Sequence, residues 1–355
     1  METRSSTFVI LTPGFAKDED DSACLPMQQS FLLTVKKQFP QLKIIIISFH
    51  YPYRSDEYLW NGMTVIPFNG RNKGGLSKLL LFGKINSKLR AIHKENKIDG
   101  LLSFWYLECG FIAKRFADKY KIRHCSWLWG GDAKKENKFP RRLKPDANEL
   151  VALSDFMQNE FERNHGVRPL YVIPPAIDIN LFSDSPSGKD IDILGTGSLI
   201  PLKRYDIFID VVAEIKKQIP GIKVFLIGSG PEKEKLVSKI RSLGLESTIT
   251  LTSEISYPEV LAMMQRTKLF LHTSSYEGFG AVCIEALAAG AQVISFTKPM
   301  NGVIPHWQYA TDKDDMIQKA VSILNDLSTA CSPVIPYTME GSVKKMMGIF
   351  EIPLS

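Results

Sequence analysis

The sequence predicts an α/β protein built from two doubly wound domains that face each other across a central cleft. Short β-branched runs alternate with amphipathic, helix-length segments along the chain, a pattern typical of parallel sheets covered by crossover helices. A chain of 355 residues is longer than a domain with a single hydrophobic core usually is, and its 44% hydrophobic residues are enough for two cores. A stretch rich in Pro, Ser and Asp at residues 174–190 interrupts the pattern as a linker would.

The first half of the chain is expected to form one domain, residues 1–180. Hydrophobic runs predict its strands at residues 7–13, 43–49, 63–68, 99–105, 122–129, 149–153 and 169–174. Amphipathic segments predict helices at 107–121 and 154–166, the second with Ser154 as N-cap and Gly166 just past its end.

The second half restarts the same pattern over residues 190–335. Its strands are expected at residues 190–199, 222–230, 248–253, 269–275 and 291–296, each leading into a helix. Residues 336–355 read as a C-terminal helix that returns to the first domain. Ligands of doubly wound sheets bind at the carboxyl ends of the strands, so a ligand is expected in the cleft between the two domains.

Composition limits where the protein is expected to function and which kinds of site it can carry. The five cysteines show no close pairs, so neither a zinc site nor a thiol-disulfide motif is expected, and reduced thiols favour the cytoplasm. The apolar run near the N-terminus is too short for a signal sequence or a membrane span. A net charge of +6 permits an anionic ligand or surface without requiring one.

The segment SSYEGFGAVCIEALAAG, residues 274–290, predicts a turn followed by a helix over 279–289 that Gly290 closes. Gly278 and Gly280 would leave the backbone amides of the first helical turn uncovered. These amides and the helix dipole predict a site for phosphate or for sugar hydroxyls.

Two glutamates flank this turn. Glu285, Ala281 and Gly278 fall on one helix face at spacings of four and three, so the Glu285 carboxylate would overlook the anion site across small residues. A carboxylate beside a diphosphate repels it, so Glu285 is expected to accept hydrogen bonds from a ribose and Glu277 from a sugar. For an arbitrary pair of glutamates the alternative is that both are solvated.

The segment Gly197–Phe296 resembles a known family in four ordered blocks: GSLIPLKRYDIFIDVV, FLIGSGPEKEKL, YPEVLAMMQRTKLFLHTSSYEGFG and CIEALAAGAQVISF. The blocks are similar to those of the retaining nucleotide-sugar glycosyltransferases of family four, which have the GT-B fold. The resemblance implies that Lys203 grips the donor diphosphate, that Glu277 touches the donor sugar, and that Glu285 holds the ribose. The remaining donor-binding residues that it implies are Gly197, Gly278, Phe279, Gly280 and Ala281.

The sequence departs from this family at several positions. Ser198 stands where members commonly carry an arginine, and Arg204 is a candidate for a shifted replacement. Gly14 is a single glycine where many members have two, and Trp129 stands where many have a histidine near the donor sugar. Asp132 is a candidate to assist there instead, so Gly14, Trp129 and Asp132 are predicted on the acceptor and sugar side. Packing of Trp129 at a strand end is an equally good interpretation.

Neither a metal nor a cofactor is expected, because members of the family neutralise the leaving diphosphate with the lysine and the helix amides. The acidic run KDEDD, residues 17–21, is better interpreted as solvated charge than as a D-x-D metal motif. The six histidines show no ligand spacing and are set aside as ligands. The basic stretches lack the aromatic spacing of a nucleic-acid platform, so no nucleic acid is expected.

Residues 71–97 carry eight basic residues against Glu95 alone. Leucines and isoleucines interleave with them at helical spacing, as in a helix lying on an anionic membrane. An ordinary helix with its apolar face on the sheet is the alternative. If the membrane interpretation holds, the protein is peripheral at the inner face near a lipid-linked acceptor.

The predicted function is that of a retaining, metal-independent glycosyltransferase. It would move a hexose-type sugar from a nucleoside diphosphate sugar to a hydroxyl of a glycan or lipid-linked glycan, in cell-surface polysaccharide synthesis. The resemblance implies front-face substitution, with Lys203 and Glu277 as the catalytic residues. Two alternatives remain: a nucleotide-sugar epimerase on the same scaffold, and a sugar-nucleotide-binding protein without catalysis.

Overall fold

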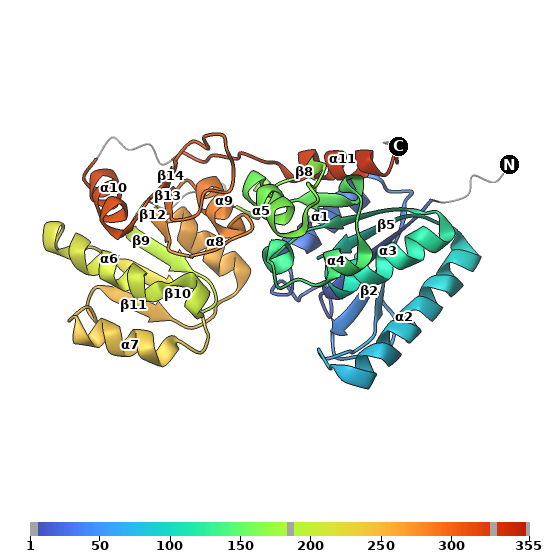
Figure 1. Ribbon diagram of the computed structural model, residues 1–355. Helices are drawn as coiled ribbons and strands as arrows, with labels where there is room; N and C mark the ends of the chain where they lie inside the picture. The colour runs from blue at the N-terminus through green and yellow to red at the C-terminus, as the bar shows by residue number, and fades with distance from the viewer. Residues whose placement is uncertain (1–5, 183–187, 327–331, 353–355) are drawn as a thin grey trace. The chain divides into compact units, whose positions relative to one another are not determined.

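The computed structural model describes residues 6–182, 188–326 and 332–352, in two compact units (Figure 1). The first unit ends at Pro175 and takes up the chain again at Met339, and the second runs from Ala176 to Thr338. The boundary therefore falls at the start of the predicted linker, a few residues before position 180. Positions 183–187 of that linker lie outside the described residues.

A mostly parallel sheet forms the first unit, with strand order β3-β4-β2-β1-β5-β6-β7-β8. Its strands are β1 (Thr7–Gly14), β2 (Lys43–Tyr51), β3 (Tyr58–Trp60), β4 (Met63–Pro67), β5 (Ile98–Phe104), β6 (Arg123–Trp127), β7 (Leu150–Ala152) and β8 (Tyr171–Val172). Every strand predicted for this half is present. The short edge strand β3, antiparallel to β4, was missed by the sequence analysis because three residues give no periodic signal.

Helices cover both faces of this sheet (Figure 1). They are α1 (Pro26–Gln38), α2 (Gly75–Asn96), α3 (Glu108–Tyr120), α4 (Phe139–Leu143), α5 (Asp155–His165) and α11 (Met339–Ile349). Apolar side chains of α2 and α3 form one core cluster with Val9 and Leu11 of β1. Phe8, which points to the other face, packs edge-on against Phe350 just after α11. The α5 boundaries confirm the predicted caps, because the Ser154 side chain accepts from the Met157 amide.

A parallel sheet of order β11-β10-β9-β12-β13-β14 forms the second unit. Its strands are β9 (Ile191–Thr196), β10 (Val224–Ile227), β11 (Ile249–Thr252), β12 (Thr267–His272), β13 (Gln292–Ser295) and β14 (Trp307–Tyr309). Its helices are α6 (Tyr205–Gln218), α7 (Lys233–Ser242), α8 (Tyr257–Gln265), α9 (Ala281–Ala288) and α10 (Lys313–Asn325). This strand order is that of a nucleotide-binding doubly wound sheet, and it switches direction between β9 and β12.

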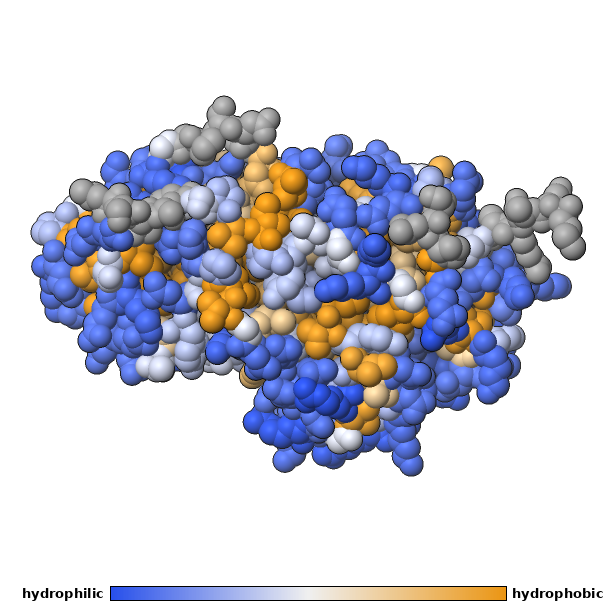
Figure 2. All heavy atoms as spheres, turned by 90° about the horizontal axis from the view of Figure 1, so that it is seen from above, coloured by the Kyte–Doolittle hydropathy of each residue, from blue (hydrophilic) through white to orange (hydrophobic). Residues whose placement is uncertain are grey.

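The core of the second unit lies between its sheet and the helices α6, α7 and α10. Leu269 and Leu271 of β12 belong to this cluster, so the intervening Phe270 points to the opposite face. Polar side chains cover most of the surface seen from above, with separate hydrophobic patches between them (Figure 2). Within the part of the chain that the structure describes, no helix is long and apolar enough to cross a membrane.

Candidate active site

A partly buried ion cluster lies at the carboxyl edge of the second sheet. Lys203 ends the short helix η4 (Pro201–Lys203), which follows β9, and its Nζ donates to Glu277 Oε1 at 2.5 Å. His272 is the last residue of β12, and its Nε2 lies 3.4 Å from the same oxygen. Because β9 and β12 flank the switch point, the sheet itself brings these three side chains together.

Glu277 is ionised in this cluster. Burial alone would raise the pKa of its carboxyl, but the hydrogen bond from His272 and the charge of Lys203 outweigh burial and lower the pKa to about 2. The carboxylate therefore presents acceptor oxygens at any physiological pH. Such a group binds hydroxyls and repels a bare phosphate.

Backbone and side-chain hydrogen bonds fix the cluster in place. Thr273 Oγ1 donates to the Lys203 carbonyl at 2.8 Å, and the Ser275 amide donates to the Leu202 carbonyl at 3.0 Å. These bonds join the loop after β12 to the helix η4. Lys203 and the loop that carries Glu277 are consequently tied to each other by bonds to the main chain of η4.

Glycines bring the loops after β9 and β10 into close contact. A Cβ on Gly228 would lie 2.0 Å from the Gly197 carbonyl oxygen, and Gly228 adopts a φ of 157°. Next along the chain, the Leu199 amide donates to the Ser229 carbonyl at 2.8 Å. Only glycine fits at position 228, which explains the first glycine of the GSG in the second sequence block.

Helix α9 begins later than predicted. It runs over Ala281–Ala288 with Gly280 as N-cap, instead of over 279–289. Gly280 has a φ of 86°, a left-handed conformation that cannot continue an α-helix. Phe279 is buried and packs against the Trp307 ring, so it anchors the turn. The N-cap Gly280 has no side chain with which to cap the helix, and the loop that carries Glu277 leads directly into the first turn.

Glu285 lies inside α9 and is buried. Its Oε1 accepts a hydrogen bond of 3.0 Å from the Tyr257 hydroxyl at the start of α8. Burial raises the pKa of this carboxyl to about 7, and the bond from Tyr257 opposes the rise. Burial raises the pKa of the Cys283 thiol well above its usual range, and the charges of Glu277 and Glu285 raise it further.

In the first unit, the loop after β6 is organised by Asp132. Its fully buried carboxylate accepts from the backbone amides of Trp129 at 2.8 Å and Tyr106 at 2.9 Å. Burial raises the pKa of this carboxyl to about 7 against those two bonds. The Trp129 ring packs against Trp127 and Trp105, with ring centres 5.3 and 5.6 Å away. Both side chains therefore have structural partners at the ends of β5 and β6.

A second polar cluster lies at the carboxyl edge of the first sheet. His50 Nε2, near the end of β2, is 2.9 Å from Glu108 Oε2 at the start of α3, and Lys78 pairs with the other oxygen of Glu108. Trp105 follows β5 with a φ of 69°. His50, Glu108 and Trp105 line a cavity of about 240 Å³. The predicted Gly14 ends β1 on the same edge and pairs with Tyr51.

Comparison with known proteins now adds to this geometry. The family model described as glycosyl transferases group 1 matches residues 178–315. Residues 178–315 form a glycosyl transferases group 1 domain. Lys203, Glu277 and Glu285 all lie inside the matched segment, so the predicted family resemblance is confirmed for the part of the chain that carries the cluster.

Two curated relatives show how far the likeness extends. A 2-deoxystreptamine N-acetyl-D-glucosaminyltransferase of Niallia circulans is 30% identical over 157 residues, which cover 43% of this chain and 37% of that protein. A poly(ribitol-phosphate) alpha-N-acetylglucosaminyltransferase of Staphylococcus aureus is 26% identical over 186 residues, 51% of this chain and 37% of that protein. The chain thus spans less than half the length of either relative.

Solved structures extend the likeness to both units. Anabaena Alr3699/HepE, in complex with UDP and glucose, has a TM-score of 0.65 at 17% identity and covers 97% of this chain and 95% of its own. TarM has a TM-score of 0.69 at 12% identity, and the match covers 98% of this chain and 99% of TarM. These neighbours are GT-B glycosyltransferases, so the predicted GT-B fold class is confirmed.

Sequence reasoning missed several polar partners, some in each unit. His272 and His50 were set aside because they have no motif spacing, yet each lies at the carboxyl end of a strand, which is the signal that could have found them. Tyr257 precedes Glu285 by 28 positions and gives no local signal. The shifted Arg204 stacks its guanidinium over the Phe296 ring at 5.4 Å, and Ser198 is exposed.

The acidic run at 17–21 is only partly solvated, so its interpretation needs correction. Asp21 accepts from the Lys17 and Cys24 amides at 3.1 and 3.2 Å and from the Tyr51 hydroxyl at 3.0 Å. The other four residues of the run are exposed. Asp21 therefore closes the loop after β1. Among the described residues, no group of three or more His, Cys, Asp and Glu side chains is placed to hold a metal ion.

Proposed function

We propose that this chain transfers a sugar from a nucleoside diphosphate sugar to a hydroxyl of a glycan or lipid-linked glycan, with retention of anomeric configuration. The observation that carries the proposal is the cluster of Lys203, Glu277 and His272 beside the uncapped start of α9, inside the group 1 domain. It combines a cation, a helix N-terminus without a side-chain cap and an ionised carboxylate at a switch point.

The two glutamates contact different parts of the donor. The diphosphate binds Lys203 and the amides around Gly280 and Ala281, where the helix dipole favours negative charge. Glu285, about one turn into α9, accepts from the ribose hydroxyls, and Tyr257 holds its orientation. Glu277, kept ionised, accepts from hydroxyls of the transferred sugar.

The reaction needs no covalent enzyme intermediate. The bond between the anomeric carbon and the diphosphate oxygen breaks, and the acceptor oxygen bonds to the same face of that carbon. The acceptor proton passes to the departing phosphate, so the products are a glycoside and a nucleoside diphosphate. Lys203 and the helix amides stabilise the charge that develops on the phosphate, in the place of a metal ion or a cofactor.

The acceptor binds the first unit at the edge where Gly14 ends β1. The Trp105 ring offers an apolar face for a sugar, and Glu108, whose pKa is lowered by His50 and Lys78 against the effect of burial, accepts from hydroxyls. Asp132 and Trp129 hold the neighbouring loop. A lipid-linked acceptor would bring residues 71–97 to an anionic, cytoplasmic membrane surface, in polysaccharide synthesis.

Product analysis tests the proposal. Isotope-labelled nucleoside diphosphate sugars are incubated with the protein, with and without an oligosaccharide or lipid-linked acceptor, and the glycoside's anomeric configuration is determined by NMR. Retained configuration with stoichiometric release of nucleoside diphosphate is expected only when the acceptor is present. An altered nucleotide sugar formed without acceptor would instead indicate an epimerase. Tight donor binding without turnover on any acceptor would indicate a binding protein without catalysis.

A further inference from the structure

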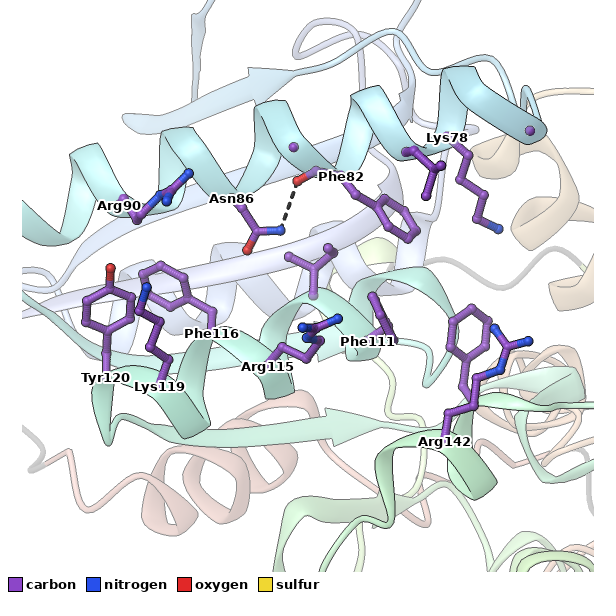
Figure 3. Close-up of a pocket in the computed structure, with 15 residues that line it drawn as sticks. Lys78, Phe82, Asn86, Arg90, Phe111, Arg115, Phe116, Lys119, Tyr120 and Arg142 are labelled. Atoms are coloured by element: carbon purple, nitrogen blue, oxygen red, sulfur yellow. Dashed lines mark hydrogen bonds between the residues drawn. The ribbon is translucent and has the colours of Figure 1, made fainter.

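A long groove runs between α2 and α3 on the surface of the first unit, and α4 closes one end (Figure 3). Its volume is about 690 Å³. Side chains from α2 line one wall, side chains from α3 line the other, and Arg142 and Phe139 come from α4 (Figure 3). The groove belongs to the helical face of the sheet and is separate from the cavity at Trp105, although Phe139 lines both.

The groove is strongly cationic. The residues that line it include five cations and no acid: Lys78, Arg90, Arg115, Lys119 and Arg142. Lys78 pairs with Glu108, whereas the other four are exposed and have no carboxylate partner among the described residues. Four unpaired cations around one groove favour an anionic occupant.

Aromatic rings form a continuous apolar floor beneath these cations. Phe82 and Phe111 lie 5.7 Å apart between ring centres, and Phe111 lies 5.7 Å from Phe139. The Arg115 guanidinium is 5.4 Å from the Phe111 ring centre, and Lys78 Nζ is 6.0 Å from that of Phe139. A ligand that fills this groove therefore carries both negative charge and an apolar chain.

Exposed leucines continue this apolar surface at the start of α2. Leu76, Leu79 and Leu80 are 72%, 67% and 60% exposed, and Leu79 lines the groove. The core-facing side chains of the same helix are buried: Leu81, Ile85, Leu89 and Ile92. At about 100° per residue the three exposed leucines lie roughly opposite this buried stripe, so packing on the sheet does not explain them.

We propose that the groove binds an anionic phospholipid of a membrane leaflet. The lipid phosphate contacts the unpaired arginines and Lys119, one acyl chain lies along the aromatic floor, and the exposed leucines enter the leaflet beside it. Free phosphate would satisfy the cations but would leave the rings and leucines without a partner. The inference rests on the proposed function in one respect: a lipid-linked acceptor would share this leaflet.

Vesicle flotation at physiological salt tests the proposal without donor or turnover. We expect the protein to float with phosphatidylcholine vesicles that contain phosphatidylglycerol, and not with phosphatidylcholine alone. The double variant Arg115→Glu with Arg142→Glu should bind at least about fivefold more weakly for each cation lost. Its matched control, Lys37→Glu with Lys345→Glu, makes the same change in net charge on α1 and α11 and should float like the wild type.

A second pair of variants tests the apolar part. Leu76→Ser with Leu80→Ser should reduce flotation, whereas Leu59→Ser with Leu170→Ser, exposed leucines elsewhere in the unit, should not. Equal losses in a groove variant and its control would overturn the proposal. So would stabilisation by inorganic phosphate without any flotation. Donor-induced thermal shifts of the same variants report on the second unit, so failure of the lipid site is distinguishable from failure of the proposed function.

Discussion

The carboxyl edges of the two sheets hold their polar side chains in different ways. In the second unit, Lys203, Glu277 and His272 form a compact ion cluster, and burial and pairing drive the pKa of Glu277 and Glu285 in opposite directions. In the first unit, an ion cluster of His50, Glu108 and Lys78 lies at the edge beside stacked tryptophan rings, and the Asp132 carboxylate accepts from backbone amides.

This contrast matches what each edge would have to recognise. A diphosphate and a ribose present fixed charges and hydroxyls, which paired ions and helix amides can meet at fixed positions. An acceptor presents sugar rings, for which aromatic faces and one carboxylate suffice. Substitutions in the second unit should therefore change donor binding and turnover, and substitutions in the first unit should change only the response to acceptor.

The largest effect is expected at Lys203. Lys203→Ala should lower turnover by about 10² to 10³, because it removes the cation that stabilises the leaving phosphate. Initial rates at saturating donor and acceptor measure this loss. The control Lys268→Ala removes a lysine paired with Asp192 on the same two strands, away from the carboxyl edge, and should keep near wild-type rates. Comparable rates in both variants would remove Lys203 from the chemistry.

The next largest effect is a pH dependence of donor affinity, which arises from the titration of Glu285. With a pKa of about 7 in the free protein, its carboxyl is ionised in about a tenth of molecules at pH 6 and nine-tenths at pH 8. Because only the ionised form accepts from both ribose hydroxyls, donor affinity should rise about tenfold over that interval. Calorimetric titration with nucleoside diphosphate measures it. Glu285→Gln should bind weakly and without this slope, and an equal slope in that variant would contradict the assignment.

A substitution of Trp105 tests the proposed role of the first unit in acceptor binding. Trp105→Ala should raise the acceptor KM about five- to tenfold, through loss of stacking area, and leave the donor KM unchanged. Steady-state kinetics with each substrate varied in turn separates the two constants. Tyr53→Ala, which removes an exposed ring from the same unit, should change neither. A donor KM that rises with the acceptor KM would contradict the division of labour.

The smallest effect is expected at Tyr257. Tyr257→Phe removes the one hydrogen bond to Glu285 that the structure shows, so the pKa of the carboxyl should rise further and donor binding at neutral pH should weaken about fivefold. The midpoint of the pH dependence should move upward at the same time. Tyr309→Phe, at an exposed ring on β14, is the control. An unchanged midpoint would mean that Tyr257 only packs against the helix.

The sequence predicted the architecture because parallel strands covered on both faces read as β-branched runs, and segments such as KIIIISF and IKVFLIG need no partner to be recognised. The family resemblance predicted Lys203, Glu277 and Glu285 in one site, and Lys203 contacts Glu277 because the carboxyl ends of neighbouring strands meet at one edge. The start of α9 depends on the left-handed φ of Gly280, and the pairing of Glu285 depends on Tyr257 from another helix. Such features come from tertiary packing, which no local pattern encodes.

A thermal-shift panel with UDP, GDP, ADP and their common sugars tests the central claim most directly. One nucleotide series should raise the unfolding midpoint of the wild type, because ligand at about a hundred times its Kd adds roughly 2.7 kcal/mol of stability. Lys268→Ala should keep this response and Glu285→Ala should lose it. Equal shifts in Glu285→Ala and the wild type, or no shift with any nucleotide, would contradict a donor site at the carboxyl edge of the second sheet.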